Sequence, residues 1–414
     1  MNAMPKQRIL TCALLAALGV AALAAPAPGW TDRKEYDLVL KIRSEASPQK
    51  QLELLEQWKQ QYPKTEMRQM RRELFLAAYQ ASGDNAHMFD VAREMLAEQP
   101  ENLVGVYWCT LLTPTVKDAK TDTLAAGEKA AKQLLAKLDV YFAADQKPAE
   151  MQAADWQNQK SAAELLGYRT TGWVQWQRGE LPAAEKTFTA YLQKDPKSAE
   201  VTAWLGYVMA GQDHLVPAAW QLSRAASMKG DGALAESVRR QVDDLSERLY
   251  AAYHGGADGM EKLKAGAIAA AFPPDDFQVE SAEVVRQRKA EEQLNQADPE
   301  LGAWLRISRQ LNGPDGDKYF AETLKPAPLP KLRGTIVRIN PANKPNEIVL
   351  GLSSATAEEV TLKLSTPFPY PADAGTVLEF QGTADSFVKA PFSLTVLTEP
   401  ANISGWPDPP GRKK

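Results

Sequence analysis

The residue types that carry most protein chemistry are scarce in this sequence of 414 residues, which holds three histidines and two cysteines. His87, His214 and His254 lie in different segments, and none has a second His or a Cys at the spacing of metal ligands. No serine stands in the Gly-x-Ser-x-Gly pattern of a nucleophile elbow. The paired carboxylates Asp243-Asp244 and Glu291-Glu292 lie on predicted helices, where such pairs are typical of a solvated face. We therefore expect no catalytic residue, no cofactor and no metal site.

The overall charge is close to neutral, with 48 Lys and Arg against 52 Asp and Glu, a net charge of −4 at pH 7. Nucleic-acid-binding domains usually carry a strongly basic surface, so this balance disfavours a nucleic-acid partner. The hydrophobic fraction of 44% and the charged fraction of 24% are those of ordinary globular proteins. The length suggests two or three domains.

The N-terminus carries the pattern of an export signal. Lys6 and Arg8 precede an apolar run over residues 9–20, and the small residues of Ala22-Leu23-Ala24 follow. We expect residues 1–25 to be a signal peptide that is cleaved near its end. The alternative is an uncleaved anchor that holds the protein at a membrane, because the apolar segment approaches the length of a short membrane span.

Cleavage of that segment would remove Cys12 and leave Cys109 alone, so the mature chain could form no internal disulfide. Cys109 ends the apolar run 106–109, and a lone cysteine on an apolar helix is typical of a small buried side chain. A reactive thiol at Cys109 is the alternative.

An internal repeat with a period of 34 residues organises the middle of the chain, where residues 165–198 and 199–232 align without gaps. Six aligned pairs agree in size or character, namely Gly172 with Gly206, Leu181 with Leu215, Ala184 with Ala218, Phe188 with Leu222, Tyr191 with Ala225, and Pro196 with Gly230. A turn at Gly179-Glu180 and a stop at Pro196 predict two helices in the first stretch, over residues 163–178 and 182–194.

This pattern resembles the tetratricopeptide repeat, whose motif runs aromatic, Leu-Gly, aromatic, small Ala, Phe, Ala and Pro. The residues that carry the resemblance are Tyr168, Gly172, Ala184, Phe188 and Pro196, then Leu205, Gly206, Ala218 and Ala225. Thr171 stands in place of the usual Leu, and Gly230 in place of the final Pro. The resemblance implies a helical solenoid in which the first helix of each repeat lines a concave groove.

We expect this tetratricopeptide-type solenoid to span residues 35–253, because two repeats alone cannot bury their open faces. Residues 69–102 form a further candidate repeat, with Gly83-Asp84 as its turn and Pro100 as its stop. The layout of signal, repeats and a small C-terminal β-domain is similar to that of secreted bacterial tetratricopeptide proteins.

Residues 254–330 are predicted to be a helical linker region that ends in a proline-rich hinge at residues 325–330. From residue 331 to 400 the hydrophobic period changes to two, and five or six short strands predict a small antiparallel β-barrel or sandwich. Its outline resembles an oligonucleotide-binding barrel. The aromatic residues of this part are expected to fill its core, and no nucleic acid is expected as a partner. Residues 401–414 form a polar tail.

The candidate binding residues follow from the resemblance, which implies that set positions of the first helices face the groove. These positions hold Arg169, Trp173, Trp176, Glu200, Ala203 and Tyr207. Trp, Tyr and Arg are enriched at binding hot spots, so the strip is a candidate site for a protein or peptide partner. The alternative is that Trp173 and Trp176 pack inside the array.

The function expected from these observations is that of a non-enzymatic scaffold or adaptor that is exported to the periplasm or secreted. Its helical array would bind a protein partner, and its β-domain would add a second contact or a cap. An assembly or cell-wall accessory factor, tethered through an uncleaved N-terminal segment, is the second hypothesis. An enzyme is the third.

Overall fold

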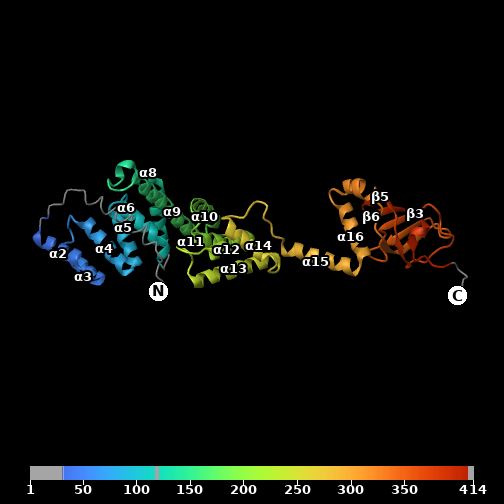
Figure 1. The fold of residues 1–414 in the computed structure, drawn as a ribbon, viewed down its shortest axis with the longest axis horizontal. Helices are drawn as coiled ribbons and strands as arrows, with labels where there is room; N and C mark the ends of the chain where they lie inside the picture. The colour runs from blue at the N-terminus through green and yellow to red at the C-terminus, as the bar shows by residue number, and fades with distance from the viewer. Residues whose placement is uncertain (1–29, 31, 117–120, 409–414) are drawn as a thin grey trace. The chain divides into compact units, whose positions relative to one another are not determined.

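The computed structural model describes residues 30, 32–116 and 121–408, which form two compact units (Figure 1). Along the chain, the first unit ends at Ala282 and the second begins at Glu283. The predicted signal peptide over residues 1–25 lies outside the described residues, as does residue 409 onward in the predicted polar tail. The boundary divides the predicted linker region 254–330 between the two units.

The first unit is helical. Its longer helices are α2 (Arg33–Ser44), α3 (Pro48–Gln61), α4 (Arg68–Ser82), α5 (Asn85–Glu98), α6 (Leu103–Leu112), α7 (Thr121–Ala136), α9 (Ala153–Gln177), α10 (Leu181–Lys194), α11 (Ala199–Ala210), α12 (Leu215–Ser227), α13 (Glu236–His254) and α14 (Met260–Ala269). From α2 to α13 each of them packs chiefly against its neighbours in the chain, while α14 packs on α12. The short helix α8 (Leu138–Tyr141) interrupts the series between α7 and α9.

Three helix pairs of this unit share one turn geometry. The pairs are α4 with α5, α9 with α10, and α11 with α12, and the turn residues are Gly83, Gly179 and Asp213, with φ of 75°, 75° and 60°. In each turn the next residue donates its backbone N–H to a carbonyl five residues earlier, at 2.9, 2.9 and 3.0 Å. Each turn residue is the fifteenth of its stretch, in 69–102, 165–198 and 199–232, so the sequence period recurs in the backbone.

Small residues let the paired helices cross closely in the two clear repeats. A Cβ atom on Gly172 would lie 2.5 Å from the ring of Phe188, and one on Gly206 would lie 2.7 Å from Cγ of Leu222. Both glycines therefore stand where a neighbouring helix leaves no room for a side chain. The two contacts are 34 residues apart at both ends, so the helix crossing is equivalent in the two hairpins.

The end of α14 is held by side chains from α12. Trp220 Nε1 donates to the carbonyl of Ala270 at 3.3 Å, and Gln221 Nε2 donates to that of Ala271 at 2.9 Å. Arg224 Nη1 donates to the carbonyl of Ala267 at 3.0 Å. These bonds satisfy carbonyl groups that a helix end leaves without a partner.

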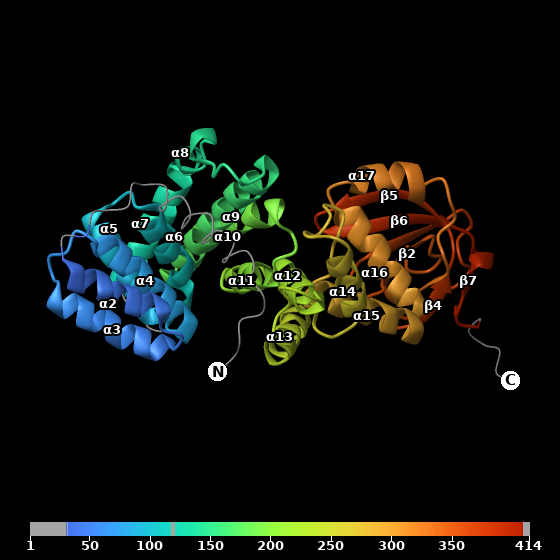
Figure 2. The ribbon, with the colours of Figure 1, turned by 60° about the vertical axis from the view of Figure 1, so that its left-hand side comes forward.

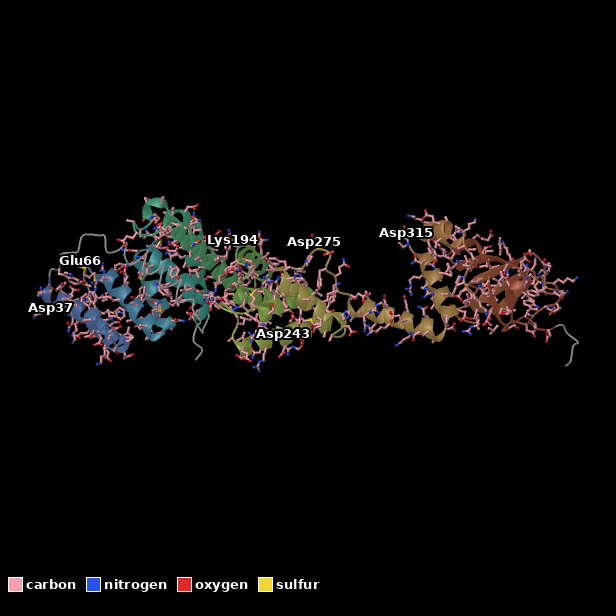
Figure 3. The ribbon with its side chains drawn as sticks, in the orientation of Figure 1. Asp37, Glu66, Lys194, Asp243, Asp275 and Asp315 are labelled. Carbon is pink, nitrogen blue, oxygen red and sulfur yellow. The ribbon has the colours of Figure 1, made fainter. Side chains whose placement is uncertain are left out.

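Ion pairs connect α13 and α14, the last two helices of this unit. Lys264 Nζ of α14 lies 2.9 Å from Oδ1 of Asp243, which α13 presents at the surface (Figure 3). The same ammonium group lies 2.7 Å from Oε1 of Glu247 on the next turn of α13. One lysine therefore connects α14 to two successive turns of α13.

The second unit combines helices with a sheet. Its helical elements are α15 (Ala282–Ala297), α16 (Pro299–Asn312), α17 (Gly316–Tyr319) and a π-helical turn over Phe320–Leu324. Its strands are β1 (Leu332–Asn340), β2 (Glu347–Gly351), β3 (Val360–Leu364), β4 (Val377–Phe380), β5 (Thr383–Lys389), β6 (Phe392–Thr398) and β7 (Ile403–Ser404). The expectation of a mostly helical chain followed by short strands is confirmed.

The strands form one sheet in the order β5-β6-β3-β2-β1-β4-β7. Neighbours are antiparallel except β3 and β6, which run parallel, with Val360 opposite Leu394. Among the described residues the ladder does not close, because β5 and β7 remain at opposite edges. The predicted antiparallel barrel or sandwich is therefore corrected to an open, mixed sheet. The physical reason is that β4 pairs with β1 whereas β5, after Gln381 and Gly382, pairs with β6, and the isolated bridge from Thr383 to Pro328 does not extend into a ladder.

Helix α16 crosses one face of this sheet and closes its core (Figure 2). Trp304 of α16 is fully buried and packs with Leu332, Ile336 and other apolar strand residues. The carboxylate of Glu359 accepts hydrogen bonds from the backbone N–H groups of Leu352 and Ser353, both at 2.7 Å, and faces Trp304 Nε1 at 3.4 Å. One acidic side chain thus ties α16 to the β2–β3 connection.

Candidate functional site

The predicted binding residues come from two first helices of adjacent hairpins, α9 and α11. Arg169 and Trp176 are seven residues apart on α9, and Glu200 and Tyr207 are seven apart on α11. Seven residues are close to two helical turns, so each pair lies on one face of its helix. The structure brings these four side chains together, with Trp204 among them. We call Arg169, Trp176, Glu200, Trp204 and Tyr207 the α9–α11 cluster.

The charged members of the cluster neutralise each other. Arg169 Nε donates to Glu200 Oε2 at 2.8 Å, and Arg169 Nη2 donates to Glu200 Oε1 at 3.1 Å. This two-point geometry is the strong form of an Arg–carboxylate contact. The Arg169 side chain is 11% exposed, whereas that of Glu200 is 41% exposed. The carboxylate is therefore the part of the pair that solvent, or a partner, can reach.

The aromatic members surround this ion pair. The guanidinium carbon of Arg169 lies 5.0 Å from the ring centre of Trp204, within the range of a cation–π contact. Trp176 and Tyr207 stack with their ring centres 5.9 Å apart and their planes at 10°. All three rings are half-buried, and burial raises the pKa of Tyr207. The cluster thus contains three large, partly exposed rings that contact one another.

Two predicted groove residues lie in the core instead. Trp173 is 8% exposed and belongs to an apolar cluster with Phe188 and Leu205. Ala203 is 3% exposed and packs with Leu222. Sequence spacing placed both on the correct helices, but it could not show that the next helices cover them.

Trp204 is a member of the cluster that the repeat positions did not predict. It lies four residues after Glu200 and three before Tyr207, so it shares their helix face. Its ring also contacts Trp176 and Phe188, with ring centres 6.4 and 5.8 Å away. The helical spacing from two predicted residues was the signal that could have identified it.

One nitrogen of the ion pair has no acceptor. Arg169 Nη1 is buried and, among the described residues, forms no hydrogen bond. A buried donor without an acceptor costs free energy, and each such group in a folded protein needs an explanation.

The histidines, which could act in catalysis or metal binding, lie far apart in the sequence and pair with different partners. His87 Nδ1 lies 2.7 Å from Asp84, His214 Nδ1 lies 3.4 Å from Glu185, and His254 Nδ1 lies 2.8 Å from the carbonyl of Glu280. In the part of the chain that the structure describes, no group of three or more His, Cys, Asp or Glu side chains is arranged to hold a metal ion.

Cys109 is fully buried in α6, and burial raises the pKa of its thiol to about 12. The thiol is therefore protonated at neutral pH, and because the thiolate is the nucleophile, the side chain is inert in the folded protein. Burial also bears out its expected place as a small residue of the apolar core.

Comparison with known proteins assigns no family, since the sequence matches no protein-family model and no curated protein. Within the described ranges, no helix combines the length and the apolar character needed to cross a membrane. The arrangement of side chains in the α9–α11 cluster is therefore the ground on which a function can be proposed.

Proposed function

We propose that the helical unit is a tetratricopeptide-type solenoid that serves as a non-enzymatic scaffold. Three helix pairs with the same turn, at the same place in stretches of 34 residues, support this proposal. So does packing that follows the order of the chain, because repeat arrays are built from contacts between neighbours. Such arrays have extended surfaces on which peptides and protein segments bind.

The partner-binding surface in this proposal is the α9–α11 cluster. The observation that carries it is the set of three half-buried rings, Trp176, Trp204 and Tyr207, held around a neutralised ion pair. Large aromatic side chains fixed by their neighbours lose little conformational freedom on binding, which makes them effective anchors. A protein or peptide that lays apolar side chains across these rings is the partner we propose.

The proposed location is outside the cytoplasm, in the periplasm or the medium, and rests on the signal pattern in residues 1–25. If that segment is retained, the same binding surface would be tethered to a membrane. The protein would then act as an envelope assembly or cell-wall accessory factor.

A photocrosslinking experiment tests the binding surface. A photoreactive phenylalanine analogue placed at Trp176 in the full chain is expected to crosslink to one discrete protein in the native envelope fraction. The matched control carries the analogue at Thr189, a half-buried residue of α10 that lines a separate groove of about 500 Å³. Thr189 lies in the same hairpin, so it tests whether the face matters and not merely the hairpin.

A Tyr207→Ala variant completes the test, because it removes a ring from the cluster without adding charge. It is expected to abolish the crosslink from Trp176 while the helical circular dichroism remains that of the wild type. Equal crosslinking from Trp176 and Thr189, or crosslinking that survives Tyr207→Ala, would show that the cluster is not the partner site.

A further inference from the structure

A second candidate binding surface lies in the other unit, on α16. It is a groove of about 560 Å³, within the range of volumes that hold small ligands or short peptide segments. Its lining comes from α15, α16, α17 and the segment that leads into the sheet, and consists of Glu291, Ala303, Arg306, Ile307, Arg309, Gln310, Tyr319, Leu324 and Pro330. All of these residues belong to the second unit.

The groove combines hydrogen-bond donors with an apolar floor. Arg306, Arg309 and Gln310 lie on one turn of α16 and are exposed at the rim. Beneath them, Ile307 and Leu324 are buried, at 5% and 6% exposure. Two guanidinium groups three residues apart on a helix point to the same side, where they can bind two acceptors of one ligand.

Helix α15 already places oxygen atoms on both arginines. Arg309 pairs with the carboxylate of Glu291, and Arg306 Nη1 donates to Asn295 Oδ1 at 2.7 Å. Glu291 and Asn295 are four residues apart on α15, so both point from one face of that helix toward α16. The structure thus shows the mode in which α16 binds a helix with oxygen ligands one turn apart.

Helix α15 buries little apolar surface where it covers α16. Val285 is the one buried residue among the described side chains of α15, and no α15 residue belongs to the apolar core of the sheet unit. The Arg309–Glu291 pair is exposed, with 64% and 39% of the two side chains accessible. Exposed ion pairs contribute little to stability, so a competing ligand can displace this one.

We propose that this α16 groove binds an acidic peptide segment of a protein partner. Arg306 and Arg309 pair with two of its carboxylates, and the apolar floor receives its aliphatic side chains. The charge of the lining selects this occupant: Glu291 is its one acidic residue and is already paired with Arg309. When Glu291 leaves, the lining carries two positive charges and no negative charge. The proposal is independent of the α9–α11 cluster.

The test measures fluorescence polarisation of a labelled peptide of glutamate and leucine at helical spacing, titrated with the full chain at low salt. Arg306→Ala/Arg309→Ala is expected to weaken binding by about tenfold, because it removes both charge-assisted contacts. The matched control, Arg338→Ala/Lys344→Ala, removes the same charge from elsewhere in the sheet unit and is expected to change the affinity by less than about twofold.

Glu291→Gln provides the more specific result, because local loss of the groove would weaken binding, whereas removal of a competing carboxylate should strengthen it. Removal of the competing carboxylate is expected to tighten binding by about threefold. The proposal is overturned if Glu291→Gln leaves the affinity unchanged or weakens it, or if the control pair costs as much as the arginine pair. It is also overturned if a glutamine version of the peptide binds equally well, or if a single-stranded oligonucleotide binds more tightly.

Discussion

The hairpins 165–198 and 199–232 have the same turn geometry and the same helix crossing, with different side chains at both places. Both place a left-handed residue at the fifteenth position, but it is Gly179 in one and Asp213 in the other. Both cross at a glycine, but the side chain that covers it is Phe188 in one and Leu222 in the other. The comparison shows that the backbone of the turn and the close approach of the helices are kept in both hairpins. The side chain that packs against the crossing glycine can differ, provided that the helices stay in contact.

The largest effect in both hairpins is expected when the filling residue itself is removed. Phe188→Ala deletes a fully buried ring and should lower the free energy of unfolding by about 3–5 kcal/mol, compared with about 2–5 kcal/mol for Leu222→Ala. Urea unfolding followed by far-UV circular dichroism measures both. A loss below about 1 kcal/mol for Phe188→Ala would mean that the neighbouring helices collapse into the space.

Adding a methyl group to the crossing glycine tests the contact between Gly172 and Phe188 from the α9 side. Gly172→Ala brings Cβ to within 2.5 Å of the Phe188 ring, and we expect overpacking to cost about 1–3 kcal/mol. Phe188→Leu in the same chain should recover at least about half of that loss, because it installs the smaller residue of the second hairpin. A double-mutant cycle gives the coupling energy, and additive losses would contradict a direct clash.

The turn position should give effects of opposite sign in the two hairpins. Gly179→Ala forces a Cβ into left-handed backbone and should cost about 1 kcal/mol. Asp213→Gly relieves the same strain and should be neutral or stabilising by up to about 1 kcal/mol. Hydrogen exchange of peptides from α10 and α12 reports each turn separately. A loss at Asp213→Gly would show that the aspartate side chain stabilises its turn.

The smallest expected effect extends the comparison to the upstream repeat. Ser198 accepts a hydrogen bond from the N–H of Val201, and Asn102 accepts one from that of Gly105, each as the last residue of its stretch. Ser198→Ala and Asn102→Ala should each cost about 0.5–1 kcal/mol through loss of the helix cap. Thermal unfolding compared with Ser198→Asp, which keeps a cap, separates capping from other effects of the substitution.

Helices and strands of this fold could be predicted where the local sequence pattern alone determines them. The alternating apolar residues of 332–339 predicted a strand, which is β1. The glycine and proline residues of 165–198 predicted a helical hairpin, which is formed by α9 and α10. Sheet closure could not be predicted, because it depends on what the chain does at Gln381 and Gly382. No local pattern states that β4 pairs with β1 while β5 pairs with β6.

The candidate site was predicted only in part, because the sequence pattern gives the helix that carries a residue but not its burial. The resemblance to the tetratricopeptide repeat placed Arg169 and Glu200 on neighbouring first helices, and they form an ion pair. Spacing did not separate Trp176, which is half-buried beside Tyr207, from Trp173, which the next helices cover. Burial of a side chain depends on helices that lie outside its own repeat, and a repeat alignment carries no information about them.

The bonds from α12 to the last turn of α14 have a consequence for where this chain can be cut. Cleavage or truncation after residue 232 would coincide with the end of the second sequence repeat, yet it would remove α13 and α14, which pack against α12. Trp220, which is 1% exposed and packs against Phe277, would then face water together with the donors of Gln221 and Arg224. We therefore expect a fragment that ends at residue 232 to expose apolar surface, whereas a fragment that runs to Ala282, where the first compact unit ends, keeps these contacts.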